Sequence, residues 1–336
     1  TVDVYQKYIK DLLQKKVKMP TSIGYGNGYE VSYMNSGKMT NKGWEFRVDA
    51  VPFENKDWRV GFYFNIAHNE NKITEMPDNY TEENYTFGNG IYAYRREEGR
   101  PMGSFYGYRY KGVCQNKDAT YARDADGNVM KDISGNAIVM RNGTATIAPG
   151  DALYEDINHD GVINQYDIVY LGNSNPRFTG GAGVNVSYKQ FKLSAIFYGR
   201  YGQDVVNSTR LNNESMRGID NQSTAVLRRW RNEGDQTDIP RALYGEGYNT
   251  LGSDRFVEDA SYLRLKSLSF NYRLPKKIIQ RWGFSNIDVY VTGYNLFTWT
   301  KYTGQDPEVK TENTYATDSA TTPASIQLVA GFNLSF

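Results

Sequence analysis

WRVGFYFNIAHN, residues 58–69, alternates apolar and polar side chains with a period of two. One set of alternate positions holds large apolar side chains, namely Trp58, Val60, Phe62, Phe64 and Ile66. The other set holds Arg59, Gly61, Tyr63, Asn65 and Ala67. Because successive side chains of an extended strand point to opposite faces, this pattern predicts a β-strand with one continuous apolar face.

The same alternation recurs along the chain. It is found in residues 43–51, 181–202, 261–275, 286–297 and 325–336. Within 261–275 the apolar phase shifts by one residue near Lys266 and Ser267, which predicts a β-bulge there. The last stretch, SIQLVAGFNLSF, keeps one apolar face without interruption to the aromatic Phe336. Antiparallel strands therefore dominate the predicted fold.

Two all-β architectures produce such strands: a soluble sandwich, whose apolar faces form a core, and a membrane barrel, whose apolar face contacts lipid. The strands run for about 9 to 12 residues, the length that crosses a bilayer at a tilt. Aromatic residues gather at strand ends, as in the interfacial girdles of barrels. They are Trp44, Trp58, Phe191, Tyr201, Tyr262, Tyr272, Trp299 and Tyr302. These features favour a transmembrane antiparallel β-barrel.

The connections alternate between short and long, which also favours a barrel. Short turns are expected at 54–57, 189–190 and 275–286, and long segments at 12–41, 75–175, 207–258 and 300–323. Outer-membrane barrels have short periplasmic turns and long extracellular loops. We therefore expect about eight spanning strands, the first near 1–11 running outward and the last, 324–336, running inward. Loops of this size suit part of a wider barrel, and the start inside an alternating stretch indicates a piece of a longer protein.

Composition excludes several functions. The formal net charge is +1, so the chain lacks the basic excess of a nucleic-acid-binding surface. Cys114 is the single cysteine and the two histidines, His68 and His159, are far apart, which excludes an intrachain disulfide and a Cys/His metal site. No Ser, Cys or His arrangement typical of nucleophilic catalysis is found, so we expect a protein that is not an enzyme.

DINHDGVINQYD, residues 156–167, has the spacing of a calcium-binding loop. The expected ligands are the side chains of Asp156, Asn158, Asp160 and Asp167 and the backbone carbonyl of Val162. Gly161 permits the sharp turn and Ile163 anchors the loop to apolar neighbours. We expect a structural Ca²⁺ that orders the long extracellular loop region 75–175. The alternative is an Asx-rich turn that its own backbone satisfies without metal.

The long loops also contain aromatic residues that could stack on cargo. The candidates are Tyr80, Tyr85, Tyr92, Tyr94, Trp230 and Tyr248. Stacking of aromatic rings on sugars is the functional interpretation. The alternative is that these side chains pack the loops or meet a partner protein.

Several stretches, in a consistent order from one end of the chain to the other, resemble SusC/RagA-type TonB-dependent outer-membrane transporters. They include NSGKMTNKGWEF (35–46), GSFYGYRYKGV (103–113), GNSNPRFTGG (172–181), ASYLRLKSLSFNYRLP (260–275) and VYVTGYNLFTWTKYTGQDPE (289–308). The resemblance implies a barrel of about 22 strands, of which residues 1–336 would be the C-terminal eight. It also implies a preceding plug domain and TonB box, and an assembly signal at the chain end that contains Gly331, Leu334 and Phe336.

The resemblance further implies a SusD-like surface lipoprotein as partner and TonB-driven import of oligosaccharides or peptides across the outer membrane of a Gram-negative bacterium. The aromatic loops favour glycan cargo. Contacts with outer-membrane lipid and lipopolysaccharide are expected, and none with nucleic acid. A passive porin, an adhesive barrel and a soluble calcium-binding module of the dockerin kind are the alternative functions.

Overall fold

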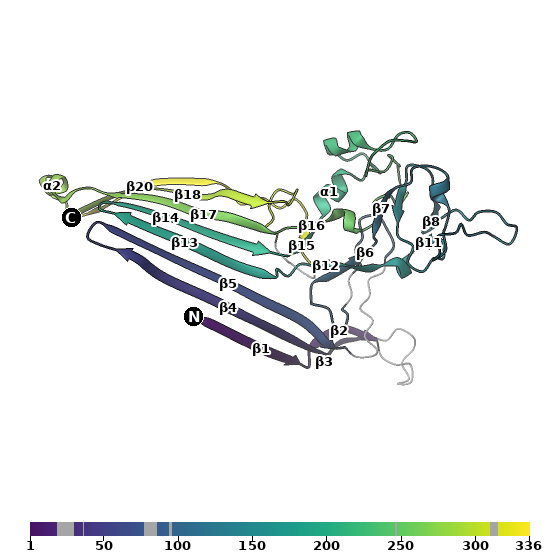
Figure 1. Cartoon of the computed structure of the whole chain (residues 1–336), viewed down its shortest axis with the longest axis horizontal. Helices are drawn as coiled ribbons and strands as arrows, with labels where there is room; N and C mark the ends of the chain where they lie inside the picture. Colours follow the sequence, from purple (N-terminus) through teal and green to yellow (C-terminus); the bar gives the residue numbers. More distant parts are fainter. Residues whose placement is uncertain (19–29, 36, 77–85, 94–95, 246, 310–314) are drawn as a thin grey trace.

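The computed structural model describes the chain except residues 19–29, 36, 77–85, 94–95, 246 and 310–314. Its main feature is an eight-stranded antiparallel sheet in the order β1-β4-β5-β13-β14-β17-β18-β20. These strands are β1 (Val2–Lys10), β4 (Lys38–Glu54), β5 (Trp58–Glu75), β13 (Phe178–Tyr188), β14 (Phe191–Tyr201), β17 (Tyr262–Arg273), β18 (Asn286–Thr300) and β20 (Gln327–Ser335). The sheet is one curved part of a barrel, which confirms the predicted fold class (Figure 1).

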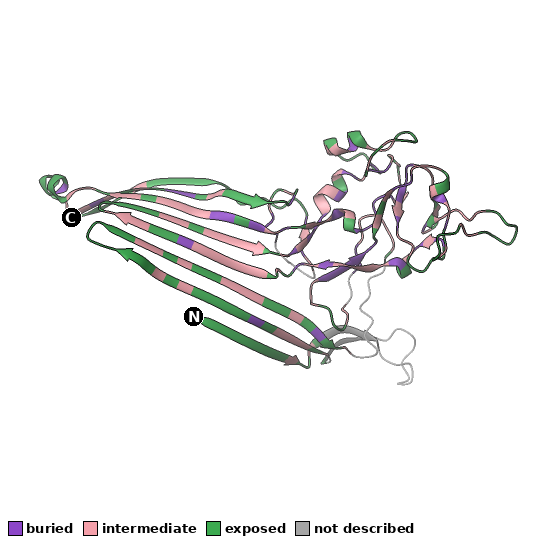
Figure 2. Ribbon diagram, in the orientation of Figure 1, coloured by how far each residue is buried: buried purple, intermediate pink, exposed green. Residues whose placement is uncertain are grey.

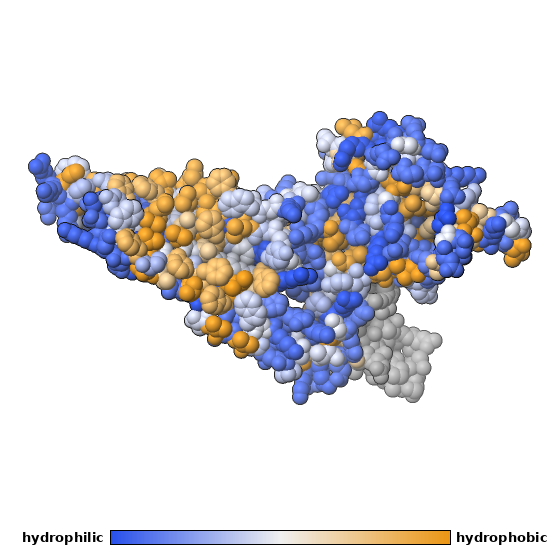
Figure 3. All heavy atoms as spheres, viewed as in Figure 1, coloured by the Kyte–Doolittle hydropathy of each residue, from blue (hydrophilic) through white to orange (hydrophobic). Residues whose placement is uncertain are grey.

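The strand register places the alternating apolar residues on one face of the sheet. Across neighbouring strands Ile66 pairs with Gly180, Gly180 with Gly199, and Gly199 with Leu263. Large side chains on this face are far from buried: Phe62 is 39% and Phe270 46% exposed. Apolar side chains gather over the strands, while polar residues dominate at both ends (Figure 3). No second layer of the described residues covers this apolar face, as expected for the outer face of a membrane barrel.

The phase shift in 261–275 is a bulge. The pairing of β17 with β18 and with β14 changes register around Lys266, so that Leu265 and Leu268 both stay in the apolar rows. This confirms the bulge predicted near Lys266 and Ser267. An extra residue in one strand is the ordinary way to restore an alternating face.

The strand connections are short at one end of the sheet and long at the other. The short ones are 55–57, 189–190 and the segment with α2 (Lys276–Ile279) and η6 (Gln280–Trp282). β4 and β5 have 17 and 18 residues, longer than expected, because their hairpin continues past the other strands toward the long loops. A small hairpin of β2 (Leu13–Lys18) and β3 (Glu30–Asn35) lies at the same end. Both chain termini are directed toward the other end of the sheet, where the short turns lie (Figure 1).

The described parts of the long loops fold together into a separate layer at the loop end of the sheet, here called the loop cap (the described residues within 86–175, 203–260 and 302–318). Most buried side chains lie in it, whereas most residues of the sheet are half-buried or exposed (Figure 2). Its elements are β6 (Ser104–Gly107), β7 (Tyr110–Val113), η2 (Asp118–Thr120), β8 (Arg141–Asn142), β9 (Ala145–Thr146), β10 (Ala152–Tyr154), β11 (Val162–Ile163), η3 (Gln165–Asp167), β12 (Val169–Asn173), β15 (Asp204–Asn207), α1 (Ser208–Asn213), η4 (Thr224–Arg228), η5 (Asp254–Phe256), β16 (Val257–Asp259) and β19 (Thr317–Asp318). No helix in the described part of the chain is both long and apolar enough to cross a membrane.

Candidate functional site: the loop cap

The loop cap is held by apolar clusters that join segments distant in sequence. One cluster contains Tyr92, Phe105, Val206, Leu211 and Phe256. A second contains Tyr108, Ala152, Tyr154, Ile163 and Leu251, and a third contains Val205, Ala260, Tyr302, Val309 and Ala316. Because each of these three clusters draws on at least two of the long loops, the loops form one folded unit and not separate flexible arms.

Buried ion pairs connect α1 to η5 and β16. Glu214 is 4% exposed and accepts hydrogen bonds from Arg210 Nε at 3.0 Å and from Arg255 Nη2 at 2.8 Å. Arg210 Nη1 also donates to Glu258 at 3.2 Å. The Arg255 guanidinium lies between the rings of Tyr110 and Phe256, with Cζ 5.2 and 4.8 Å from their centroids. Pairing of this kind keeps buried charges from being isolated at a large energetic cost.

A second polar contact joins the 75–175 region to the 203–260 region. The Asp151 carboxylate accepts from Arg241 Nε at 2.7 Å and Nη2 at 3.2 Å, and from the Asn249 amide at 3.2 Å. Neither this contact nor the Glu214–Arg255 pair could be found from the sequence. Their partners are 90 or more and 41 residues apart, respectively, and no short-range pattern marks them, whereas Arg210 and Glu214 are only four residues apart.

The loop aromatics that the sequence offers for cargo binding are partly outside the described residues, since Tyr80, Tyr85 and Tyr94 fall there. Of the others, Tyr92 is 6% exposed and its hydroxyl donates to the Ser253 carbonyl at 2.8 Å. Burial raises the pKa of this phenol. Trp230 packs against Gly150, and Tyr248 lies 4.8 Å from the Phe87 ring, centroid to centroid. These contacts belong to the alternative interpretation, in which the side chains pack the loops.

The loop 156–167 has the turn geometry that its sequence predicts. His159 and Gly161 adopt positive φ, at 55° and 81°, and Ile163 is fully buried in the second apolar cluster. The Asp156 carboxylate accepts from the backbone N–H of Gly161 at 2.8 Å, and Asp160 accepts from that of Val162 at 2.7 Å. The backbone of the loop thus donates hydrogen bonds to its acidic side chains in the manner of an Asx turn.

Asp167 closes the loop from the other side. Its carboxylate accepts from the N–H groups of Ile157 and Asn164, each at 2.8 Å, and it is fully buried. Burial raises its pKa, and the charges of Asp156 and Asp160 raise it further. The Val162 carbonyl accepts from the Asn164 amide at 3.0 Å, and the Asn158 amide donates to Asp160 at 2.9 Å.

The geometry therefore satisfies these groups within the protein. Across the described residues, no group of three or more His, Cys, Asp or Glu side chains is placed to hold a metal ion. Carboxylate oxygens retain lone pairs after accepting one backbone hydrogen bond each. Calcium binding in this loop would require small movements of the acidic side chains toward one centre.

The predicted assembly signal lies on the last strand. Leu334 pairs with Ile287 on the apolar face, and Gly331 faces the Tyr290 ring on the polar face, where a Cβ would lie 2.6 Å from the Tyr290 hydroxyl. Phe336 is 89% exposed, with its ring 4.9 Å from that of Phe284.

Comparison with known proteins gives consistent relatives, although no family model matches the chain. The TonB-dependent receptor P3 of Formosa agariphila is 32% identical over 319 residues, which cover 93% of this chain and 29% of that protein. The TonB-dependent receptor SusC of Bacteroides thetaiotaomicron is 26% identical and is matched over all of this chain and 30% of its own length.

Solved structures agree with these relatives. The structure of the RagAB peptide transporter matches the whole chain with a TM-score of 0.69 at 26% identity. A "closed-closed" state of the RagAB peptide importer matches with a TM-score of 0.71 at 25% identity. Both matches cover 33% of the other chain. This chain thus spans about a third of the length of the proteins it resembles.

Proposed function

Because the chain is a portion of a TonB-dependent receptor of the SusC/RagA type, a class of Gram-negative outer-membrane β-barrel proteins, we propose that the complete protein imports large nutrients across the outer membrane. Residues 1–336 supply eight strands of its barrel wall, as the C-terminal segment, and the loop cap is extracellular. Energy for import comes from TonB through a part of the protein outside this chain, and no catalysis is involved.

The folded loop cap is the observation that carries this proposal. Its buried ion pairs and apolar clusters make a rigid surface over the end of the sheet, which a passive channel does not need. Such a preorganised surface lowers the entropic cost of binding a large cargo or a lid protein. A SusD-like surface lipoprotein is the partner that we propose for it.

For the cargo we propose oligosaccharides, with peptides as the second candidate. Aromatic residues make up 14% of the whole chain, many of them lie in the loops, and aromatic faces suit sugar rings. Peptides are the second candidate because RagAB, whose structure this chain resembles, is a peptide transporter. The loop aromatics in the described residues mostly pack the cap, so any stacking on cargo would fall to the remaining ones.

Uptake by whole cells tests both levels of the proposal. Two strains would be given defined oligosaccharides and defined peptides: one that lacks the complete gene, and the same strain with the gene restored. Each would be measured with and without a functional TonB system. We expect TonB-dependent uptake of the oligosaccharides only. Uptake of peptides alone would change the cargo, and uptake that persists without TonB would overturn active import. Co-purification of a lipoprotein with the transporter tests the partner.

We also propose that loop 156–167 binds a structural Ca²⁺ through Asp156, Asn158, Asp160, Asp167 and the Val162 carbonyl. The positive-φ turn and the carboxylates of Asp156 and Asp160, which the loop backbone holds by hydrogen bonds, support it. Extracellular sites of this type bind with dissociation constants of roughly 10⁻⁴ to 10⁻³ M. Hydrogen exchange of the loop in the complete transporter, measured in CaCl₂ and in EGTA, should show slower exchange with calcium but not with magnesium.

A matched control is available in the same loop region. Asp124 accepts backbone N–H groups in a similar Asx turn, from Asp126 at 3.0 Å and Asn128 at 2.8 Å, outside the predicted site. Asp160→Asn should abolish the calcium effect and Asp124→Asn should leave it intact. Equal exchange with calcium and with EGTA in the unmodified protein would establish the metal-free turn.

A further inference from the structure

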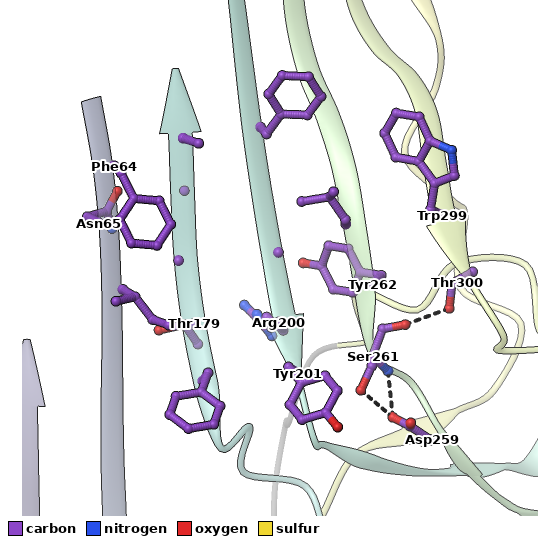
Figure 4. Close-up of a pocket in the computed structure, with 18 of the residues that line it drawn as sticks. Phe64, Asn65, Thr179, Arg200, Tyr201, Asp259, Ser261, Tyr262, Trp299 and Thr300 are labelled. Atoms are coloured by element: carbon purple, nitrogen blue, oxygen red, sulfur yellow. Dashed lines mark hydrogen bonds between the residues drawn. The ribbon is translucent and has the colours of Figure 1, made fainter. Parts of the chain in front are cut away.

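The apolar face of the sheet has a groove next to the loop cap. It crosses strands β5, β13, β14, β17 and β18 and has a volume of about 690 Å³. Its floor is formed by Gly180, Ala182 and Gly199. We call this floor, together with the side chains that surround it, the glycine groove. The walls are Phe64, Ile66, Phe178, Phe197, Tyr201, Leu263 and Trp299. Phe64 and Trp299 stand on opposite sides, with Tyr201 nearer the cap (Figure 4).

The floor is low because neighbouring backbones come too close for side chains. A Cβ on Gly180 would lie 2.6 Å from the Asn65 carbonyl oxygen, and one on Gly199 would lie 2.8 Å from that of Tyr262. The two glycines are direct cross-strand partners, so their gaps merge. The strand pairing thus fixes a depression among large side chains, where Leu263 is 47% and Trp299 52% exposed.

In the membrane this depression must be filled by hydrocarbon. The atoms that line an unfilled gap lose van der Waals contacts, and in lipid such packing replaces the hydrophobic effect as the source of affinity. A flexible linear acyl chain can lie along the floor among these aromatic side chains. The groove lies at the loop end of the strands, which the proposed orientation places in the outer leaflet.

The groove ends at polar and cationic groups. Lys301, at the end of β18, lines it and is exposed, and exposed Arg177 directly precedes the wall residue Phe178. No salt bridge among the described residues involves either cation. Asp259, the carboxylate that lines the groove, already accepts the Ser261 N–H at 2.9 Å, and its cross-strand partner Asp204 is the carboxylate whose pKa, raised by burial, the charge of Arg177 lowers in part. Cations at the membrane surface attract anionic headgroups.

We propose that the glycine groove binds one acyl chain of a lipid A molecule of the outer leaflet, with a lipid A phosphate against Lys301 and Arg177. The chain occupies the channel over Gly180, Ala182 and Gly199, between Phe64 and Trp299. The inference concerns the lipid-facing surface only and is independent of the cargo.

Native mass spectrometry of the complete transporter, purified in mild detergent, tests this proposal. Ala182→Phe fills the floor of the groove. Ala195→Phe adds the same bulk to the same apolar face, where Ala195 pairs with Val184 and Leu268 outside the groove. We expect lipid A to be retained by the unmodified protein and by Ala195→Phe. The amount of lipid A retained by Ala182→Phe should be roughly tenfold lower, which corresponds to a tenfold loss of affinity.

Charge is tested separately. Lys301→Gln should reduce retained lipid A, whereas Lys189→Gln, at a short turn on the opposite membrane surface, should not. Retention of phospholipid in place of lipid A, or equal retention by Ala182→Phe and the unmodified protein, would overturn the proposal. Loss of lipid A from Ala182→Phe and Ala195→Phe alike would also overturn it, because the groove would then have no special role. Heat-modifiable migration in gels confirms that each variant has a folded barrel.

Discussion

Glycines on the polar face of the sheet lie beneath tyrosine rings of the next strand. A Cβ on Gly183 would overlap the ring of Tyr63, its direct partner, and the same holds for Gly43 under Tyr5 and Gly331 under Tyr290. Aromatic rings laid over glycine shield a backbone that would otherwise be bare. The glycine of the predicted assembly signal, Gly331, thus also has a packing reason for its identity.

Gly183→Ala should destabilise the barrel. The added methyl displaces the Tyr63 ring and costs about 1 to 3 kcal/mol, as overpacking does elsewhere. Gly61→Ala, also on the polar face of this sheet, is the control, because its Cβ would meet nothing closer than 3.7 Å. The urea midpoint for loss of heat-modifiable migration, measured on the complete transporter, should fall for Gly183→Ala only. Equal midpoints would show that the ring moves without cost.

Asp204 in the loop cap gives a pH-dependent prediction. Burial raises its pKa and the charge of its cross-strand partner Asp259 raises it further, and together they outweigh the Asn173 N–H at 3.3 Å and the charge of Arg177, which lower it. The folded state therefore binds the Asp204 proton more tightly than the unfolded chain does. The ionised side chain destabilises the cap at neutral pH, and this loss disappears as the pH falls through the raised pKa.

Asp204→Asn should thus stabilise β15 and β16 at pH 7 by about 0.5 kcal/mol, the usual cost of like charges on facing strand positions. The gain should shrink toward pH 4, near the ordinary pKa of an aspartate. Hydrogen exchange of residues 204–207 and 257–259, corrected for intrinsic rates at each pH, measures it. A gain that is the same at both pH values would rule out the charge explanation.

At the scale of elements, sequence periodicity predicts the sheet well and the cap poorly. Each strand of the sheet has its own alternating pattern, and even the bulge at Lys266 leaves a phase shift that can be read locally. The cap elements are short, such as β8 and β11 with two residues each, and have no periodicity. Their positions depend on contacts between distant segments, for example Asp151 with Arg241, which a single sequence does not mark.

Breaking the buried pairs of Glu214 should loosen these elements together. Glu214→Gln leaves Arg255 and Arg210 without a full counter-charge in a buried site, at a cost of about 3 kcal/mol. Glu155→Gln is the control, because Glu155 pairs with the more exposed Arg109 and Lys111. We expect this substitution to lower the stability of the cap by less than about 1 kcal/mol. Limited proteolysis of the complete transporter should cut residues 203–260 faster in the first variant only. Unchanged cleavage would show that the apolar clusters hold the cap without this network.

At the scale of the whole molecule, the sheet is an open wall. Within the described residues, β1 and β20 each pair on one side only, and the sheet does not close on itself. Unpaired N–H and C=O groups along a strand edge cost several kcal/mol each in hydrocarbon, so an open edge cannot face lipid. The candidate site also depends on the rest of the barrel, because the loop cap covers only one sector of the opening that a complete barrel would have.

Residues 1–336 expressed alone should therefore not form a stable monomer in a membrane. We expect aggregates or oligomers by size-exclusion chromatography in detergent, and no heat-modifiable band, whereas the complete transporter should give both a monodisperse peak and that band. Closure of β1 on β20 as an eight-stranded barrel is the outcome that would contradict this. A barrel of about eight strands has room inside only for closely fitted side chains. Such a closed barrel would have to pack the side chains of the polar face, including Tyr198, Arg200 and Arg264, into this narrow lumen.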